Sequence, residues 1–349
     1  MSEKRFFPEL TSLKGLFILV ILLHNTSLVN PVFQNIPGIA YIELFGGDFG
    51  NSMFFMLSGF LLSMGYRSRI SSGSTTFQNY MLRRLAALYP LYLITNLVSL
   101  LIAVFRYGAS GIQLEKLAFT LLLQNGGGLT AANPYNAPTW FVSALLVCYA
   151  AYYAISRNAH TATGYRCLLF AGIAWGYTLV TRNLSVPYCF EGNGIGFMNF
   201  FIGCIFAEYW PWLTDNKAKW LRPAAVALLL GIAYLFLNYG VEIISGNVHS
   251  AAAFAVNPLI LYLALSDGLF SKFLRLKPLV YLGNISSAVF FWHLPLCYLL
   301  QDLLASGEAL NEPLFLVYLL TVLLCSALSH RLIEKRKNGT AVAAGKQKP

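Results

Sequence analysis

Long apolar stretches separated by short polar segments run through the sequence from end to end. A membrane-spanning helix needs about 20 predominantly apolar residues, and apolar runs of this length predict helices rather than strands. We therefore predict an all-α, polytopic integral membrane protein with about ten transmembrane helices. The predicted spans cover residues 13–29, 49–66, 85–105, 138–156, 167–181, 195–210, 223–239, 251–266, 279–303 and 314–333.

The polar segments complete the predicted organisation of the chain. Residues 1–12 form a short cytoplasmic lead, residues 13–334 a single membrane domain, and residues 335–349 a basic tail that we expect to be disordered. The stretch 30–48 is rich in Asn, Pro and Gly and predicts an outer loop. The apolar stretch 114–123 is too short to span and predicts an interfacial or re-entrant segment.

Lysine and arginine residues alternate with the predicted spans. All but three of the 24 fall in every second polar segment, and the exceptions are Arg106, Lys116 and Arg182. Because basic segments stay in the cytoplasm, this pattern predicts that both termini lie on the cytoplasmic side. No small-residue cleavage site follows the first apolar run, which we therefore expect to be a retained span.

The composition limits the class of protein. Hydrophobic residues make up 57% of the chain and charged residues 11%, whereas soluble domains carry about 25% charged residues. The net charge of +10 is divided among the polar segments, so we predict no nucleic-acid partner. The six cysteines show no CxxC spacing, and no P-loop, HExxH or GxSxG motif is present. We therefore predict no metal and no tightly bound cofactor.

The first predicted span carries an ionisable side chain well inside its apolar run. His24 lies about 16 Å along the helix from the start of that run, near the middle of a hydrocarbon core of roughly 30 Å. Ionisable residues at this depth are costly and by default indicate a functional site. Imidazole exchanges protons near neutral pH, so His24 is a candidate base or proton relay. The alternative is a histidine that only hydrogen-bonds a neighbouring helix.

Two small residues and two arginines stand out in the next two spans. The segment FFMLSGFLL contains Ser58 and Gly59, and small residues let membrane helices approach each other closely. Arg83 and Arg84 lie at the predicted cytoplasmic mouth of the third span. Adjacent arginines suit the phosphate groups of a ligand, although anchoring of the topology is the simpler interpretation.

Trp140 and His293 are candidates in the later part of the chain. Trp140 opens the fourth span, either as a residue of the interfacial aromatic belt or as a ring that stacks on a sugar. His293 lies inside the ninth span, where Pro295 weakens the backbone hydrogen bonding. It either assists His24 or braces a kink. Near the inner end of the sixth span, we expect Glu208 to reach water by snorkelling.

These features together resemble the membrane acyltransferase 3 family over nearly the whole chain. The most specific part is FFMLSGFLL followed by RRLAALYPLY from Arg83. The other parts are a basic residue and a histidine in the first span, then PTWFVSALLVCYAAY and LGNISSAVFFWHLPL, in the order typical of the family. The resemblance implies about ten spans in a bacterial inner membrane, and it places the catalytic residue at His24 and the family's basic residue at Lys14.

The resemblance also implies a reaction. Such proteins take an acyl group, often acetyl, from a cytoplasmic acyl-CoA and pass it to a hydroxyl of a sugar, polysaccharide or lipid-linked glycan at the outer face. We predict that acyl-CoA binds near Arg83, Arg84 and Lys14, and that His24 acts as general base or carries the acyl group itself. The predicted substrate-lining residues are Ser58, Trp140 and His293.

Lys14 departs from the family pattern. Family members commonly have an arginine, ten intervening residues and then the histidine, which returns both side chains to nearly one helix face. Here a lysine precedes the histidine and only nine residues, 15–23, intervene. This spacing leaves Lys14 and His24 about 80° apart on a regular helix, and lysine lacks the planar fork of arginine.

Two other classes of function stay open at this stage. A proton-coupled secondary transporter or exporter would use His24 as a proton relay. The lack of a visible inverted repeat and of deep acidic residues argues against it. A non-catalytic scaffold in a glycan-export machine would not depend on His24. The sequence does not name the acceptor, the acyl group or the oligomeric state.

Overall fold

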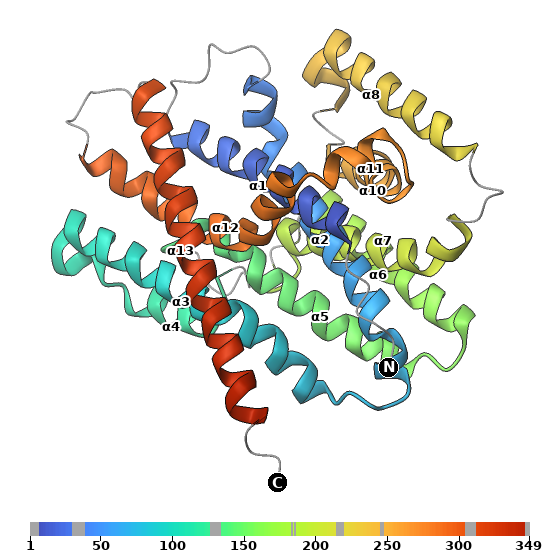
Figure 1. Cartoon of the computed structure of the whole chain (residues 1–349), viewed down its shortest axis with the longest axis horizontal. Helices are drawn as coiled ribbons and strands as arrows, with labels where there is room; N and C mark the ends of the chain where they lie inside the picture. Colours follow the sequence, from blue (N-terminus) through green and yellow to red (C-terminus); the bar gives the residue numbers. More distant parts are fainter. Residues whose placement is uncertain are drawn as a thin grey trace.

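The structure is a computed structural model that describes residues 7–29, 39–125, 134–182, 184, 186–213, 220–244, 248–303 and 312–345. Within these residues every regular element is a helix (Figure 1), as the sequence predicts. The α-helices are α1 (Pro8–Val29), α2 (Ile39–Ser71), α3 (Phe77–Tyr107), α4 (Leu114–Leu121), α5 (Trp140–Asn158), α6 (Ala162–Arg182), α7 (Glu191–Leu213), α8 (Leu221–Ile244), α9 (Val248–Ala251), α10 (Asn257–Leu265), α11 (Leu269–Leu274), α12 (Lys277–Leu303) and α13 (Glu312–Gly345).

Among the described residues, five helical segments are long and apolar enough to cross a membrane. They are Pro8–Thr26, Phe77–Gly111, Ala137–Asn158, Lys277–Gln301 and Pro313–Leu332. Two shorter apolar segments accompany them, in α8 and across α9 and α10. The chain is therefore an all-helical integral membrane protein, whereas the count of ten spans and the cytoplasmic placement of both termini stay predictions.

One predicted boundary was wrong. The second span was expected at 49–66 after an outer loop at 30–48, but α2 begins at Ile39; residues 30–38 lie outside the described part. The polar stretch GGD concealed this helix, because sliding hydropathy does not recognise glycines that serve helix packing. The span expected at 251–266 lies close to the apolar helical stretch His249–Leu265, which includes a π-helical segment (Ala252–Val256) between α9 and α10.

The other segments lie close to their predicted positions. Helix α3 continues through Pro90, and the short apolar stretch after it forms α4. Helix α13 runs as far as Gly345 and so takes in most of the tail assigned to 335–349. The remaining residues 346–349 lie outside the described part.

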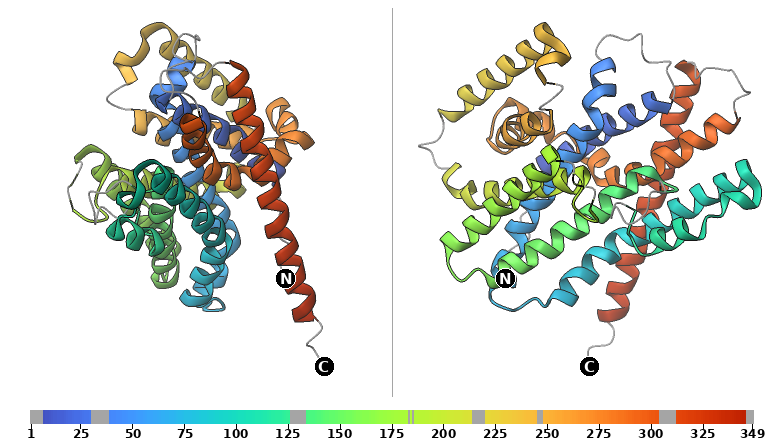
Figure 2. Two further views of the ribbon diagram at one scale, coloured as in Figure 1. Left: turned by 90° about the vertical axis from the view of Figure 1, so that its left-hand side faces the viewer. Right: turned by 180° about the vertical axis from the view of Figure 1, so that it is seen from behind.

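Glycines bring the central helices into backbone contact. A Cβ on Gly59 of α2 would overlap the Phe200 carbonyl of α7, and a Cβ on Gly283 of α12 would overlap the Thr11 carbonyl of α1. Close approach through small residues is how membrane helices gain packing contacts, so the packing role predicted for Gly59 is confirmed. Helices α1, α2, α7 and α12 form the centre of the bundle, with α8 at its edge (Figures 1 and 2).

An ion-pair network fixes the start of α1 against α11. Arg275 donates hydrogen bonds to Glu9 over 2.5 Å and to Asp267 over 2.8 Å, and these bonds raise the pKa of Arg275. Ser12 donates to the backbone carbonyl of Leu274. This anchorage sets the rotation of α1, which carries His24 about four turns further along.

Candidate functional site

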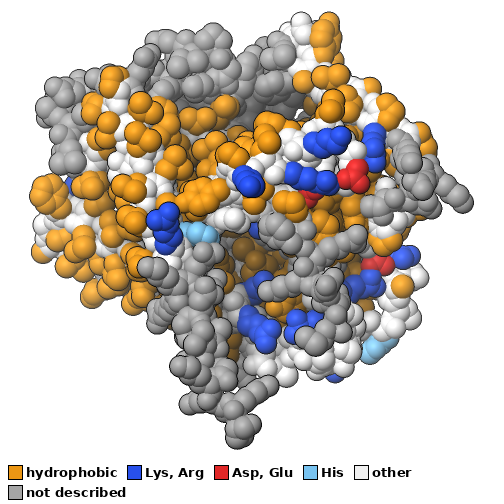
Figure 3. Space-filling model, viewed as in Figure 1, with side chains coloured by type: hydrophobic (Ala, Val, Ile, Leu, Met, Phe, Trp, Pro, Cys, Tyr) orange, Lys and Arg blue, Asp and Glu red, His pale blue; other side chains and the backbone are white. Residues whose placement is uncertain are grey.

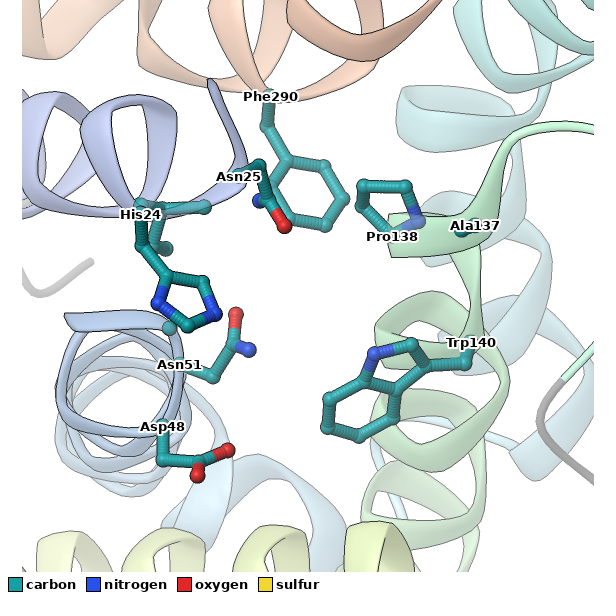
Figure 4. Close-up of a pocket in the computed structure, with 10 residues that line it drawn as sticks. His24, Asn25, Asp48, Asn51, Ala137, Pro138, Trp140 and Phe290 are labelled. Carbon is teal, nitrogen blue, oxygen red and sulfur yellow. The ribbon is translucent and has the colours of Figure 1, made fainter. Parts of the chain in front are cut away.

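A cavity of about 160 Å³ lies between the end of α1, the middle of α12, the first half of α2 and the segment that leads into α5 (Figure 4). His24, Asn25, Asp48, Asn51 and Trp140 supply its polar and aromatic groups. The full lining consists of Ile21, His24, Asn25, Gly47, Asp48, Asn51, Ala137, Pro138, Trp140 and Phe290. The structure thus places two of the predicted site residues, His24 and Trp140, in one cavity.

The His24 ring is held in one orientation and one tautomer. Its Nδ1 lies 3.3 Å from the carbonyl oxygen of Ile42, which only accepts hydrogen bonds. Nδ1 therefore carries the proton in the neutral ring, and Nε2 is the basic nitrogen. The ring of His24 enters the cavity (Figure 4). It lies against the backbone of Gly47, where an added Cβ would be 2.6 Å from Nε2. Only glycine at this position leaves room for the ring.

Asn25 follows His24 on α1 and is fixed from behind by His293. The Nδ1 of His293 lies 2.8 Å from the carbonyl oxygen of Phe290 and 3.2 Å from that of Val289. It must therefore carry the proton, which leaves Nε2 as an acceptor. Nδ2 of Asn25 lies 3.0 Å from this Nε2 and donates to it. His293 is fully buried and stands behind Asn25 rather than in the cavity lining.

Asp48 and Asn51 lie one turn apart on α2 and complete the polar wall. Asn51 is 9% exposed, and its Oδ1 has no hydrogen-bond partner among the described residues. Asp48 is half exposed at the edge of the cavity, 3.8 Å from Nε2 of His249. His249 in turn lies 3.0 Å from Glu191 at the start of α7. The cavity therefore has a carboxylate-rich rim on this side.

Pro295 leaves a backbone carbonyl of α12 available to bind the segment that precedes Trp140. A proline has no N–H to give to the carbonyl four residues earlier, which here is that of Phe291. Nδ2 of Asn136 supplies the missing donor at 3.0 Å. Thr139, the third residue after Asn136, is also buried and accepts from Asn125 at 2.8 Å. These bonds fix the turn Ala137–Thr139 and with it the position of Trp140.

An aromatic layer closes the cavity towards the other half of α2. The ring centroids of Phe55 and Phe141 are 4.3 Å apart, and those of Phe141 and Phe290 are 5.5 Å apart. Ser58 lies one turn beyond this layer, where its hydroxyl donates to the carbonyl of Phe54 at 2.8 Å. Ser58 is therefore absent from the described cavity lining, and it neighbours Tyr149 instead.

Arg84 lies near Tyr149 among three tyrosine rings. Its guanidinium carbon is 4.5 Å from the ring centroid of Tyr66 and 5.7 Å from those of Tyr80 and Tyr149. Its Nε is buried without a hydrogen-bond partner, and no carboxylate in the described part of the chain pairs with it. The neighbouring Arg83 is exposed on α3. Cation–π contacts position Arg84 and leave its donors available.

Glu208 forms ion pairs with two other arginines. It pairs with Arg67 and lies 3.2 Å from Arg166, and its side chain is only 8% exposed. The predicted snorkelling to water was wrong, because two cations on neighbouring helices meet this carboxylate inside the protein. On the face shown in Figure 3, Lys and Arg side chains gather beside a hollow with apolar side chains inside it.

Lys14 lies apart from the His24 cavity. It is half-buried on α1 and is absent from the described cavity lining. Ten residues of regular helix separate it from His24 by about 15 Å along the axis and leave the two on different faces. The structure therefore does not bring these two predicted residues together.

The sequence analysis missed Asn25, Asp48 and Asn51. Asn25 directly follows His24, so its position in the span was visible. Asp48 and Asn51 fell in or beside a predicted loop, although their spacing of three residues places both on one helix face. Treating GGD as helix continuous with the span predicted at 49–66, rather than as loop, would have placed both residues on α2.

Comparisons with known proteins agree with this description. A family model described as an acyltransferase domain matches residues 7–331. O-acetyltransferase OatA of Staphylococcus aureus, in strains NCTC 8325, COL and MRSA252, is 28% identical over 156 residues. The alignment covers 40% of this chain and 24% of the relative, so the chain spans about a quarter of the length of these curated relatives. No solved structure matches the chain.

Proposed function

Because the chain belongs to the acyltransferase 3 family, we propose that it is a membrane-bound O-acyltransferase. It moves an acyl group, in the first instance acetyl, from a cytoplasmic acyl-CoA to a hydroxyl of a sugar, polysaccharide or lipid-linked glycan. The acceptor stands at the outer face of a bacterial inner membrane. The observation that carries this proposal is His24, whose ring enters a polar cavity from a candidate membrane span.

In the proposed reaction the acceptor hydroxyl attacks the thioester carbonyl while Nε2 of His24 takes the hydroxyl proton. A C–O bond forms, the C–S bond breaks, and His24 returns the proton to the departing thiolate. The products are the ester and free CoA, and no further reactant is consumed. The hydrogen bond from Nδ1 to the Ile42 carbonyl supports this role, because it keeps Nε2 basic. A transient acyl-histidine would use the same nitrogen.

Arg84 supports a donor site at the other end of α2. A guanidinium without a carboxylate partner in the described structure suits the phosphate groups of CoA. The acyl end must then pass the layer of Phe55, Phe141 and Phe290 to reach His24. Arg83 is exposed beside it and adds positive charge at the same rim.

Transfer of labelled acetyl from acetyl-CoA to envelope glycans tests the proposal. Membranes would contain the wild-type chain, His24→Ala or, as a matched control, His160→Ala, which alters an exposed histidine. General base catalysis contributes roughly 10²–10⁴-fold, so His24→Ala should lose labelling by that factor while His160→Ala keeps it. Equal labelling in all three would remove His24 from the reaction. Proton-coupled uptake without an acyl donor, and no labelling with any acyl-CoA, would favour a transporter.

A further inference from the structure

Three side chains present oxygen atoms to the cavity beside His24. Asn25, Asp48 and Asn51 all lie in its lining, and their polar groups face the open space in Figure 4. The carboxylate of Asp48 accepts hydrogen bonds and cannot donate them while it is ionised. The two carboxamides can do either, so their orientation decides which kind of ligand the cavity fits.

The orientation of Asn25 follows from its bond to His293. Two backbone carbonyls occupy Nδ1 of His293, so its Nε2 can only accept in the neutral ring. Nδ2 of Asn25 must face this Nε2, because the amide oxygen would meet a lone pair there. The carbonyl oxygen of Asn25 is thereby turned towards the cavity, as Figure 4 shows. His293 sets this orientation without touching the cavity.

Asn51 supplies an independent observation. Its side chain is more than nine-tenths buried, yet its Oδ1 has no partner in the described structure. A buried acceptor left in this state is destabilising, and a ligand that donates a hydrogen bond would relieve the cost. Asn25 on α1 and Asn51 on α2 thus each present an oxygen that needs a hydrogen-bond donor from the ligand. The Asp48 carboxylate is a third acceptor in the same cavity.

A cavity wall built of acceptors distinguishes the two substrates of the proposed reaction. The carbonyl of an acyl thioester only accepts hydrogen bonds, so it gains nothing from this wall. A hydroxyl-bearing sugar donates several. We propose that Asn25 is an acceptor-binding residue, oriented by His293 as a positioning residue, and that the cavity holds the polyol acceptor rather than the acyl donor. This inference rests on the proposed acyltransferase function and specifies which substrate lies on which side of His24.

The partition of acetyl groups between glycan and water tests this assignment. Membranes supplied with labelled acetyl-CoA would be assayed for labelled glycan ester and for labelled acetate, the product when water replaces the acceptor. Asn25→Leu keeps the size of the side chain and removes its oxygen. We expect it to lower the glycan ester about tenfold, the effect of one lost hydrogen bond, and to leave acetate release unchanged.

A matched pair at His293 tests the positioning role. His293→Gln keeps a group that can accept from Asn25 and another that can donate to the α12 carbonyls, whereas His293→Leu keeps neither. The glutamine variant should restore at least half of the wild-type ratio of ester to acetate, and the leucine variant should resemble Asn25→Leu. Recovery of each variant as a monodisperse detergent-solubilised protein controls for misfolding.

The possible results separate this inference from the proposal beneath it. An equal fall in ester and acetate in Asn25→Leu, or no change in either, would overturn the acceptor-binding role. A wild-type ratio in His293→Leu would overturn the positioning role. A wild-type chain that yields neither ester nor acetate would overturn the acyltransferase proposal itself, and this inference with it.

Discussion

Around His24 the polar atoms face an open cavity, whereas around Glu208 they face one another. In the first region Asn51 keeps a buried oxygen without a partner among the described residues. In the second, Arg67 and Arg166 share one carboxylate. Buried polar groups are normally satisfied within the protein, so the difference separates a ligand site from a structural ion pair.

The arginines show the same difference: within the described part of the protein, Arg67 and Arg166 are paired with a carboxylate, and Arg84 is not. Its three tyrosine neighbours hold the guanidinium through cation–π contacts and not through a carboxylate. At Glu208 a carboxylate engages both guanidinium groups, whereas Arg84 has no carboxylate partner among the described residues. We therefore propose a donor site at Arg84 and a structural role at Glu208, and the following variants are designed to separate the two regions.

The largest effect is expected from Gly47→Ala in the cavity. The new methyl group would lie 2.6 Å from Nε2 of His24, so the ring must rotate away from its reactive position. A displacement of about 1 Å can cost about 100-fold in rate, and we expect a loss of this size in acetyl transfer. Gly65→Ala on the same helix meets no atom within 4 Å and should keep the wild-type rate. Wild-type transfer in Gly47→Ala would show that the ring position does not matter.

The next effect is expected from Arg84→Met at the inner rim. A hydrogen bond to a charged group contributes about 1.5–3 kcal/mol, so the KM for acetyl-CoA should rise roughly 10- to 100-fold. Arg84→Lys should recover little of this loss, because lysine lacks the planar fork. Arg157→Met removes another, exposed arginine and serves as the control. An equal KM for both methionine variants would contradict the donor assignment.

The smallest effect on the reaction is expected from Glu208→Gln. This change leaves Arg67 and Arg166 without their carboxylate, but both arginines are more than a third exposed or close to it, so water screens much of the cost. We expect a loss of about 1 kcal/mol in unfolding free energy, measured as a lower melting temperature in detergent. The KM for acetyl-CoA should stay within about twofold of wild type. A rise in KM without a change in melting temperature would reverse the assignments of Glu208 and Arg84.

The apolar runs of the sequence predicted the helical fold, and the motifs FFMLSGFLL and RRLAALYPLY indicated the family. His24 and Trp140 were found as single residues in the apolar runs. The start of α2 escaped because glycine and aspartate lower hydropathy where glycine in fact permits contact with α1. Asp48 was assigned to a loop for this reason, and its one-turn spacing to Asn51 on α2 was missed. The pattern of apolar residues reports burial in lipid and does not report helix-to-helix distances.

Ser58 and His293 show the second limit of sequence reasoning. Both lie on helices that contribute to the cavity, and neither lies in its lining. Ser58 is separated from it by Phe55, and His293 by Asn25. Which face of a helix meets a cavity depends on how the helix is rotated about its own axis, and packing sets that rotation. For α1 it is set by the close contact with Gly283 and by the ion pair of Glu9. The ion-pair partners of Glu208 could not be predicted either, because Arg67 and Arg166 are distant from it in the sequence and meet it only in the folded protein.

The most direct test of the central claim is the sidedness of acetyl transfer in sealed inverted membrane vesicles. Labelled acetyl-CoA would be added outside, which corresponds to the cytoplasm, and glycans enclosed in the lumen would be analysed for ester. The account predicts ester in the lumen with the wild-type chain and a loss of roughly 10²–10⁴-fold with His24→Ala. Ester formed only on glycans outside the vesicles, or lumenal ester that does not depend on His24, would contradict transfer through the His24 cavity.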